Sequence, residues 1–126
     1  MRILLDSHVA LWWLEDNDSL GERSRKVIEQ ADEAFFSAVT PWELGIKREL
    51  GKLTTPDGLA DALVSGGFIP LGISVQHAER APTLPLHHRD PFDRMLIAQA
   101  QLEALTLITA DGSFDPYEVD VVDARQ

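Results

Sequence analysis

Residues 2–15, RILLDSHVALWWLE, contain the pattern that decides the fold. The first part, Arg2–Asp6, is a short apolar run that ends in a carboxylate, as expected for a strand buried on both faces. The second part, His8–Glu15, is rich in large apolar residues and is typical of a buried helix. A buried strand followed at once by a buried helix is characteristic of a parallel sheet covered by helices.

Strands and helices alternate along the rest of the chain. Four more strands are expected, at 34–39, 68–71, 105–109 and 119–122. Besides His8–Glu15, helices are expected at 19–31, 40–50, 75–81 and 91–104, and a short helix is expected between the turn 54–58 and the glycine pair 66–67. In the first of these, Ser19 and Glu22 have the spacing of a capping box. With right-handed crossovers, this order predicts an α/β fold. We expect a three-layer α/β/α sandwich whose central, mainly parallel sheet has about five strands.

Length and composition are those of one compact unit. The chain has 126 residues, of which 44% are hydrophobic, and it contains no internal repeat or linker, so we expect a single domain over residues 1–126. It has no cysteine, which excludes disulfides and zinc sites built on thiolates. No apolar run approaches the length of a membrane span or a signal-peptide core, so we expect a cytoplasmic protein without membrane contact.

The chain is strongly acidic, with a formal net charge of −10. A protein that coats nucleic acid through a broad electrostatic surface is normally basic, so the charge argues against that class. An enzyme that meets phosphate groups through bound metal ions remains compatible with it, because the ions reverse the local sign of charge. The excess of acids can equally serve solubility alone.

Acidic residues recur where the expected strands end, which is the edge at which open α/β sheets bind ligands. They are Asp6 after the first strand, Glu43 in the helix after the second, Asp90 and Asp93 at the start of helix 91–104, and Asp111 after the fourth strand. Carboxylates placed together repel one another unless protons or cations compensate. Hard divalent ions such as Mg²⁺ and Mn²⁺ take oxygen ligands, so this set predicts a metal site suited to phosphate chemistry.

Each acid also has a structural alternative. Thr40–Glu43 and Asp90–Asp93 both have the form of a capped helix start with proline at the first helical position. Asp111 precedes a glycine and can be an ordinary turn residue. Asp6 gains little from capping, because the adjacent Ser7 offers a cap at lower electrostatic cost, so Asp6 is the strongest candidate for function.

Three histidines and two arginines lie near these acids in the sequence. His8, His87 and His88 could in principle join a zinc or manganese site, but adjacent histidines rarely converge on one ion and no His-x-x-x-His spacing occurs. We expect His87, His88 and Arg89 in a loop beside the site, in contact with substrate phosphates or a partner. Arg94 is expected to form an ion pair with a nearby carboxylate.

Four blocks of the sequence together resemble the PIN-domain family, and specifically the VapC-type toxins of toxin–antitoxin modules. The blocks are LLDSHVALWWL, SAVTPWELGIKRELGKL, LPLHHRDPFDRMLIAQA and LTLITADGSF. The similarity runs in order from about Ile3 to Val121. The resemblance implies a Mg²⁺- or Mn²⁺-dependent endoribonuclease on a three-layer sandwich, in which metal-activated water hydrolyses RNA phosphodiester bonds. It also implies a homodimer and a cognate antitoxin protein that silences the enzyme.

The resemblance assigns roles to individual residues. Asp6 and Asp93 would anchor the ion, and Glu43 and Asp111 would complete its ligands or orient water. Two further positions are assigned less closely: Asp90 would be either a metal ligand or only a helix cap, and Thr109 is the small hydroxyl residue near the substrate.

Two other classes of protein share some of these sequence features. A phosphoacceptor receiver domain has similar size and charge, but it requires an aspartate after the third strand and a lysine after the fifth. It also requires an acidic pair after the first strand. Here Asp6 stands alone, Gly72 follows the expected third strand, and the last lysine is Lys52, so the sequence argues strongly against this class. A non-catalytic PIN-fold domain that binds RNA or a partner without cutting remains the alternative hypothesis.

Overall fold

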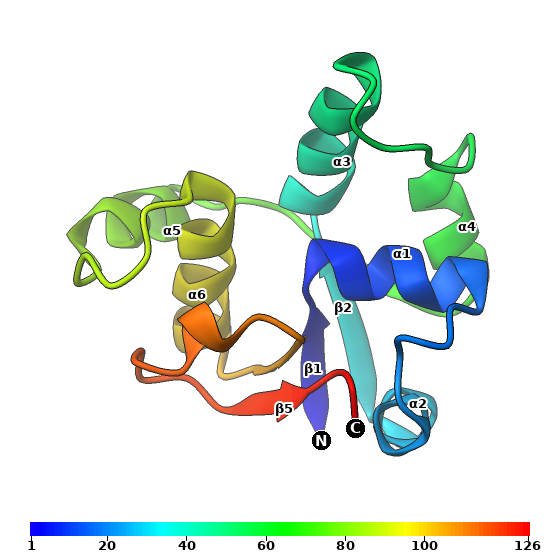
Figure 1. The fold of residues 1–126 in the computed structure, drawn as a ribbon. Helices are drawn as coiled ribbons and strands as arrows, with labels where there is room; N and C mark the ends of the chain where they lie inside the picture. Colours follow the sequence, from blue (N-terminus) through cyan, green and yellow to red (C-terminus); the bar gives the residue numbers. More distant parts are fainter.

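The computed structural model describes residues 1–126, which form an α/β sandwich around one parallel sheet (Figure 1). The sheet has five strands in the order β3-β2-β1-β4-β5, and every neighbouring pair is parallel. The strands are β1 (Arg2–Leu5), β2 (Glu33–Ser37), β3 (Ile69–Leu71), β4 (Thr106–Thr109) and β5 (Val121–Asp123). The prediction of a three-layer fold with a parallel central sheet of about five strands is therefore confirmed.

Helices cover both faces of the sheet. They are α1 (Ser7–Glu15), α2 (Glu22–Gln30), α3 (Val39–Glu49), α4 (Leu59–Ser65), α5 (Val75–Arg80) and α6 (Pro91–Glu103). Helices α1 to α4 pack on one face, and α5 and α6 pack on the other, as Figure 1 shows with the sheet seen between the two layers. None of these helices has both the length and the apolar character needed to cross a membrane.

The alternation of side chains along β1 divides the core into two parts. Ile3 and Leu5 point into the core beneath α1 to α4, whereas Leu4 points into the core beneath α5 and α6. All three side chains are fully buried. This explains why the first strand is a continuous apolar run, and it places β1 in the centre of the sheet, with Asp6 at its carboxyl end.

Two expected helix caps are wrong. Helix α2 begins at Glu22 with Gly21 in the capping position, so Ser19 does not form a capping box with Glu22. Helix α3 begins at Val39, which places Thr40 inside the helix. Ala38 occupies the capping position of α3 and offers no side-chain cap. The Ser37 hydroxyl, one residue earlier, accepts a hydrogen bond of 3.0 Å from the Val39 N–H and so satisfies one backbone donor of the first turn.

The end of the chain returns to the start of α2. The Gly21 N–H donates to the Ala124 carbonyl and the Arg23 N–H donates to the Gln126 carbonyl, at 2.9 and 2.8 Å. A Cβ atom on Gly21 would lie 2.2 Å from the carbonyl carbon of Gln126, so this close approach requires glycine. The contact fixes the backbone on both sides of Arg125.

Strand β5 ends one residue later than the sequence predicted, at Asp123 instead of Val122.

Candidate functional site

A cavity of about 440 Å³ opens at the carboxyl edge of the sheet, and 10 of its 11 lining residues are not hydrophobic. Its acidic residues are Asp6, Glu43, Asp90, Asp93 and Asp111. Its other ionisable residues are His8, Lys47, His88 and Arg125. The structure thus brings together all five acids that the sequence placed at this edge.

Asp6 lines the cavity and directly follows the central strand β1. It is only 6% exposed, and its side chain makes no capping bond to α1, as the sequence argument expected. The Thr109 hydroxyl donates a hydrogen bond of 2.7 Å to Asp6 Oδ2. Burial raises the pKa of the Asp6 carboxyl, and the charge of Glu43 adds to this, while the Thr109 bond and His8 oppose it.

Glu43 is the second buried acid of the cavity, at 3% exposure. The Lys47 ammonium, one helical turn further along α3, donates a hydrogen bond of 2.8 Å to Glu43 Oε2. Glu43 Oε1 is buried and has no hydrogen-bond partner. Burial alone would lower the pKa of Lys47, but its bond to Glu43 and the charges of Asp90 and Asp93 raise it.

Asp93, in the first turn of α6, is a further acid of the cavity with a perturbed pKa. Its Oδ2 atom lies 2.6 Å from His88 Nε2. Burial raises the pKa of Asp93 to about 7, with further contributions from the charges of Asp6, Asp90 and Glu43, and the His88 bond only partly opposes the rise. Such an arrangement favours a proton or a cation between the carboxylates.

Asp90 caps helix α6. Its Oδ1 atom accepts hydrogen bonds from the backbone N–H groups of Phe92 and Asp93, at 2.8 and 3.2 Å. The capping role that the sequence offered for Asp90 is therefore present, and it fixes the backbone that carries the Asp93 carboxylate. Asp90 still lines the cavity.

Asp111 follows β4 and faces the other acids from across the cavity. Its Oδ1 atom accepts a hydrogen bond of 2.9 Å from the Ser113 N–H, so it is also a turn residue. Although burial acts in the opposite direction, the bonds from Ser113 and the neighbouring His88 and His8 lower the pKa of Asp111. Asp111 therefore presents a charged carboxylate to the cavity near neutral pH.

The loop before α6 is held by Arg94, which forms no ion pair, contrary to the sequence prediction. Its guanidinium is buried and donates hydrogen bonds of 2.8 to 3.3 Å to backbone carbonyls. The five acceptors are Ala81, Pro82, Leu84, Pro85 and His88. A guanidinium has five N–H donors in one plane, which allows one side chain to satisfy a loop that has little regular structure of its own.

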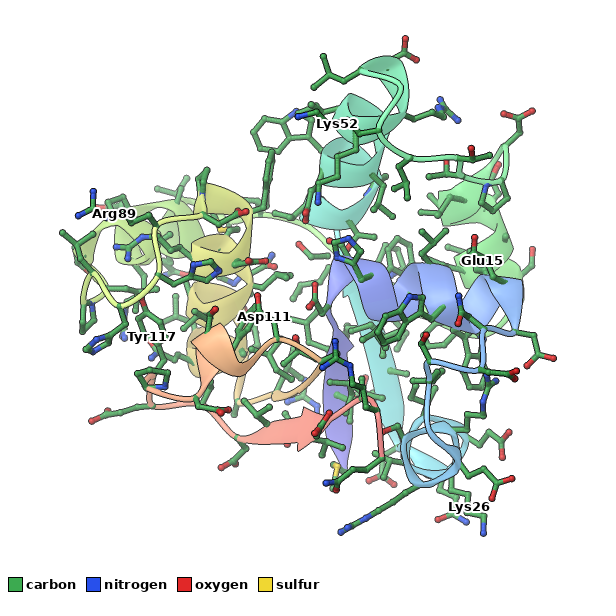
Figure 2. The ribbon with its side chains drawn as sticks, viewed as in Figure 1. Glu15, Lys26, Lys52, Arg89, Asp111 and Tyr117 are labelled. Carbon is green, nitrogen blue, oxygen red and sulfur yellow. The ribbon has the colours of Figure 1, made fainter.

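Three residues expected to contact substrate lie outside the cavity lining. The His87 ring packs edge-on against Tyr117, with 5.2 Å between ring centroids, and Arg89 lines a separate apolar cavity beside Trp42. In Figure 2, Arg89 lies on the outer side of the loop before α6, away from Asp111. Thr109 is buried beneath the site. Its hydroxyl donates a hydrogen bond to the Asp6 carboxylate and accepts one of 3.1 Å from the Asp111 backbone N–H. The structure therefore places Thr109 as a positioning residue for two acids.

Three ionisable residues that line the cavity are not among the site residues predicted from the sequence: His8, Lys47 and Arg125. Lys47 has a signal in the sequence, because it follows the candidate Glu43 by one helical turn. His8 was considered only as a possible ligand, although it follows Asp6 closely. Arg125 has no local signal, because its position depends on the return of the chain end to α2.

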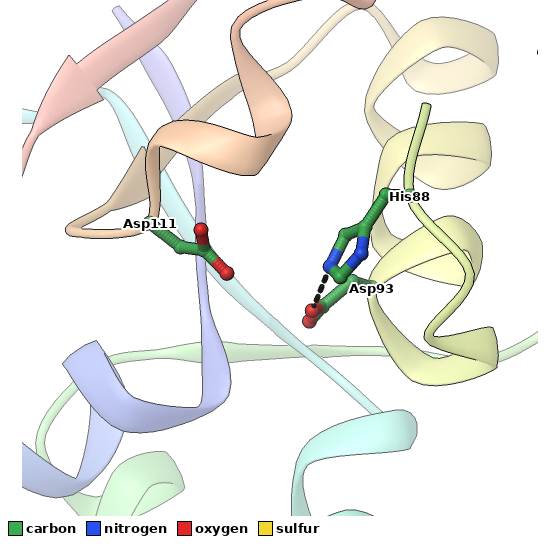
Figure 3. A group of neighbouring side chains, drawn as sticks. All are labelled: His88, Asp93 and Asp111. Carbon is green, nitrogen blue, oxygen red and sulfur yellow. Dashed lines mark hydrogen bonds and ion pairs between the residues drawn. The ribbon is translucent and has the colours of Figure 1, made fainter. Parts of the chain in front are cut away.

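The residues present fit a divalent cation. The cavity offers carboxylate oxygens from several elements, and Glu43 Oε1 is an orphaned buried acceptor that no protein donor satisfies. Donor atoms of His88, Asp93 and Asp111 lie within 4.8 Å of one another. Figure 3 shows the Asp111 carboxylate facing the His88–Asp93 pair. Oxygen-rich sites of this kind suit Mg²⁺ and Mn²⁺.

Comparison with known proteins agrees with this geometry. The family model described as PIN domain matches residues 3–119. The chain belongs to the PIN-domain family. It is 31% identical over 112 residues to Ribonuclease VapC22 of Mycobacterium tuberculosis (strain ATCC 25618 / H37Rv), covering 86% of each chain. This similarity identifies it as a VapC-type PIN domain.

Solved structures share the fold of this PIN domain. VapBC2 from Rickettsia felis, bound to a DNA fragment from its promoter, matches with a TM-score of 0.70 at 14% identity, over 97% of this chain and 98% of that one. A toxin–antitoxin complex from Klebsiella pneumoniae matches with a TM-score of 0.67 at 22% identity, over 95% of both chains.

Proposed function

We propose that this VapC-type PIN domain is a Mg²⁺- or Mn²⁺-dependent endoribonuclease, the toxin component of a VapBC-type toxin–antitoxin module. The observation that carries the proposal is the convergence of five carboxylates on one cavity, two of them almost fully buried. Isolated buried carboxylates are unstable unless paired, and the protein supplies Glu43 with only one cationic partner. A cation is the missing partner in this proposal.

A divalent ion bound in the cavity supplies Lewis-acid activation of water and of the phosphodiester. Asp6, Glu43 and Asp93 would hold it, with Asp111 as a further ligand or as the group that orients the attacking water. Thr109 and Asp90 contribute by position: the Thr109 hydroxyl fixes the Asp6 carboxylate, and the Asp90 cap fixes the turn that carries Asp93.

The RNA backbone carries negative charge, so its phosphates need cationic contacts at a site this acidic. The cavity lining contains one lysine, Lys47, and one arginine, Arg125. Lys47 is engaged with Glu43, whereas no side-chain hydrogen bond or ion pair holds the Arg125 guanidinium. Arg125 is thus available to bind a phosphate oxygen beside the reacting one.

The proposal includes protein partners. The matched Rickettsia felis and Klebsiella pneumoniae structures are toxin–antitoxin complexes, which supports a cognate antitoxin as partner of this chain. We also propose that two copies of this chain form a homodimer. Trp42 is 59% exposed and packs edge-on against Phe92 beside the apolar cavity that Arg89 lines, so an apolar contact surface exists outside the acidic site.

Cleavage of a structured RNA by the purified chain tests the proposal. We expect cutting with millimolar Mg²⁺ or Mn²⁺, none with EDTA, and none by Asp6→Asn with either ion. The matched control is Asp61→Asn, which removes an exposed acid of α4 outside the cavity. Normal cleavage by the folded Asp6→Asn variant would refute the assignment, and absence of cleavage by the wild type would favour a non-catalytic RNA- or partner-binding domain.

A further inference from the structure

His88 lies among the carboxylates of the cavity and not only at its rim. Its Nε2 atom is 2.6 Å from Asp93 Oδ2, and both face the Asp111 carboxylate across the cavity (Figure 3). These three residues form the outer, more accessible part of the site, whereas Asp6 and Glu43 are almost fully buried. The outer part therefore combines one imidazole nitrogen with two carboxylates.

The separation of the three donor atoms suits an octahedral ion. Bonds of about 2.1 Å place neighbouring ligands about 3.0 Å apart and opposite ligands about 4.2 Å apart. The donor atoms of His88, Asp93 and Asp111 already lie within 4.8 Å of one another. Binding an ion would replace the 2.6 Å hydrogen bond between His88 Nε2 and Asp93 Oδ2 and bring the three donor atoms to these spacings.

The backbone of His88 is fixed from two sides. Its N–H donates to the Tyr117 hydroxyl oxygen at 2.8 Å, and the Tyr117 hydroxyl donates to the Pro85 carbonyl at 2.6 Å. The His88 carbonyl accepts a hydrogen bond of 3.0 Å from Arg94. Ligands held in this way lose little conformational entropy when they bind, as metal sites require.

An independent observation in the same cavity also points to a ligand. Glu43 is 3% exposed, and its Oε1 atom is buried without any hydrogen-bond partner. A buried carboxylate oxygen is normally satisfied by a donor or a cation. The cavity that His88 lines therefore contains an acceptor for which the protein itself provides no partner.

We propose that His88 Nε2 is a direct metal ligand at an outer site shared with Asp93 and Asp111, and that this nitrogen makes the site favour Mn²⁺ over Mg²⁺. The inference rests on the proposed metal-dependent function and adds a nitrogen ligand to it. Mg²⁺ binds oxygen ligands almost exclusively, whereas imidazole suits transition-metal ions. A carboxylate-only site would lack this source of selectivity.

The competing explanation is that His88 only positions Asp93 through their hydrogen bond. The two roles differ in what they do to selectivity. Loss of a positioning residue weakens the binding of both ions in the same proportion, because both use the same misplaced carboxylate. Loss of a nitrogen ligand weakens Mn²⁺ more than Mg²⁺ when an oxygen takes its place.

The experiment measures metal binding directly on the full chain. The test variant is His88→Gln, which offers an amide oxygen near the position of Nε2, and the control is His87→Gln, which changes the neighbouring histidine outside the cavity. Pulsed EPR of bound Mn²⁺ should show nitrogen coupling in the wild type and in His87→Gln, and none in His88→Gln. In His88→Gln we expect the Kd for Mn²⁺ to rise at least about tenfold and the Kd for Mg²⁺ to change less than about threefold.

Three outcomes would overturn the proposal: no nitrogen coupling in the wild type, coupling that survives in His88→Gln and is lost in His8→Gln, or equal weakening of both ions in His88→Gln. Circular dichroism confirms that each variant is folded. RNA cleavage is assayed separately, so the two proposals can fail independently. A wild type that cuts RNA but shows no nitrogen coupling refutes only the ligand role of His88, and nitrogen-coupled Mn²⁺ without RNA cleavage refutes only the proposed function.

Discussion

Replacing Asp93 by asparagine should stabilise the metal-free chain, and the gain should grow with pH. The pKa of the Asp93 carboxyl is about 7 in the folded chain, against 3.8 for a free carboxyl. The folded state therefore holds its proton more tightly than the unfolded state does. The stability from this proton is fully present below pH 3.8, is lost progressively as the pH rises from 3.8 to about 7, and changes little above that.

The size of the effect follows from the two pKa values. Because the carboxyl ionises at a lower pH in the unfolded chain than in the folded chain, Asp93 lowers the free energy of unfolding by about 2 kcal/mol at pH 5 and by about 4 kcal/mol at pH 8, relative to a side chain that stays neutral. The amide of the Asp93→Asn variant cannot ionise, so this variant should gain these amounts over the wild type. For a domain of this size, about 3–4 °C per kcal/mol corresponds to a rise in Tm of roughly 12–16 °C at pH 8.

Thermal unfolding in EDTA at pH 5 and pH 8 measures the effect, with Asp61→Asn as the control for loss of an exposed acid. Millimolar Mn²⁺ at pH 8 should raise the Tm of the wild type and reduce its difference from Asp93→Asn. An Asp93→Asn variant that is no more stable than the wild type at pH 8 in EDTA, or that gains the same stability at both pH values, would show that the folded chain does not raise the pKa of Asp93.

Three other variants test the supports of the site. Thr109→Val removes the hydroxyl that bonds Asp6, and we expect slower cleavage with an unchanged fold, measured as kcat beside a far-UV spectrum. Lys47→Met leaves the buried Glu43 carboxylate unpaired at neutral pH and should lower the free energy of unfolding by about 1–3 kcal/mol in urea titrations; equal stability would contradict the pairing. Arg94→Lys has too few donors for its five carbonyls, so amide exchange should increase in the loop before α6 while the central strands stay protected.

The order of strands and helices was predictable because the apolar periodicity is strong in each segment. The starts of the helices were not equally predictable. Thr40–Glu43 and Asp90–Asp93 have the same form in the sequence, yet only Asp90 caps its helix. The difference is tertiary: the Thr40 hydroxyl lies 3.1 Å from the Ser7 hydroxyl in the buried contact between α1 and α3. No local pattern contains that contact.

The acids of the cavity were predictable for a related reason. Each one follows a strand or opens a helix at the carboxyl edge of the sheet, so strand order alone brings them together. Of the cationic side chains near these acids, only Lys47 has a position that the sequence could predict, because it follows Glu43 by one helical turn. Arg94 lies beside two acids in the sequence but turns toward the loop carbonyls, because an irregular loop with two prolines leaves carbonyls that need a donor. Arg125 reaches the cavity only through the contact of the chain end with Gly21.

The same arrangement of carboxylates that suits the cavity to a cation opposes folding of the metal-free chain. Burial and mutual repulsion raise the pKa of Asp6 and Asp93, so ionised carboxylates there oppose folding at neutral pH. Neutral hydrogen bonds such as that from Thr109 relieve only part of this repulsion. A bound cation removes both the repulsion and the need for a proton, so metal affinity and strain in the metal-free site have one physical origin. A variant that stabilises the metal-free chain by removing a cavity acid should therefore bind the ion less tightly.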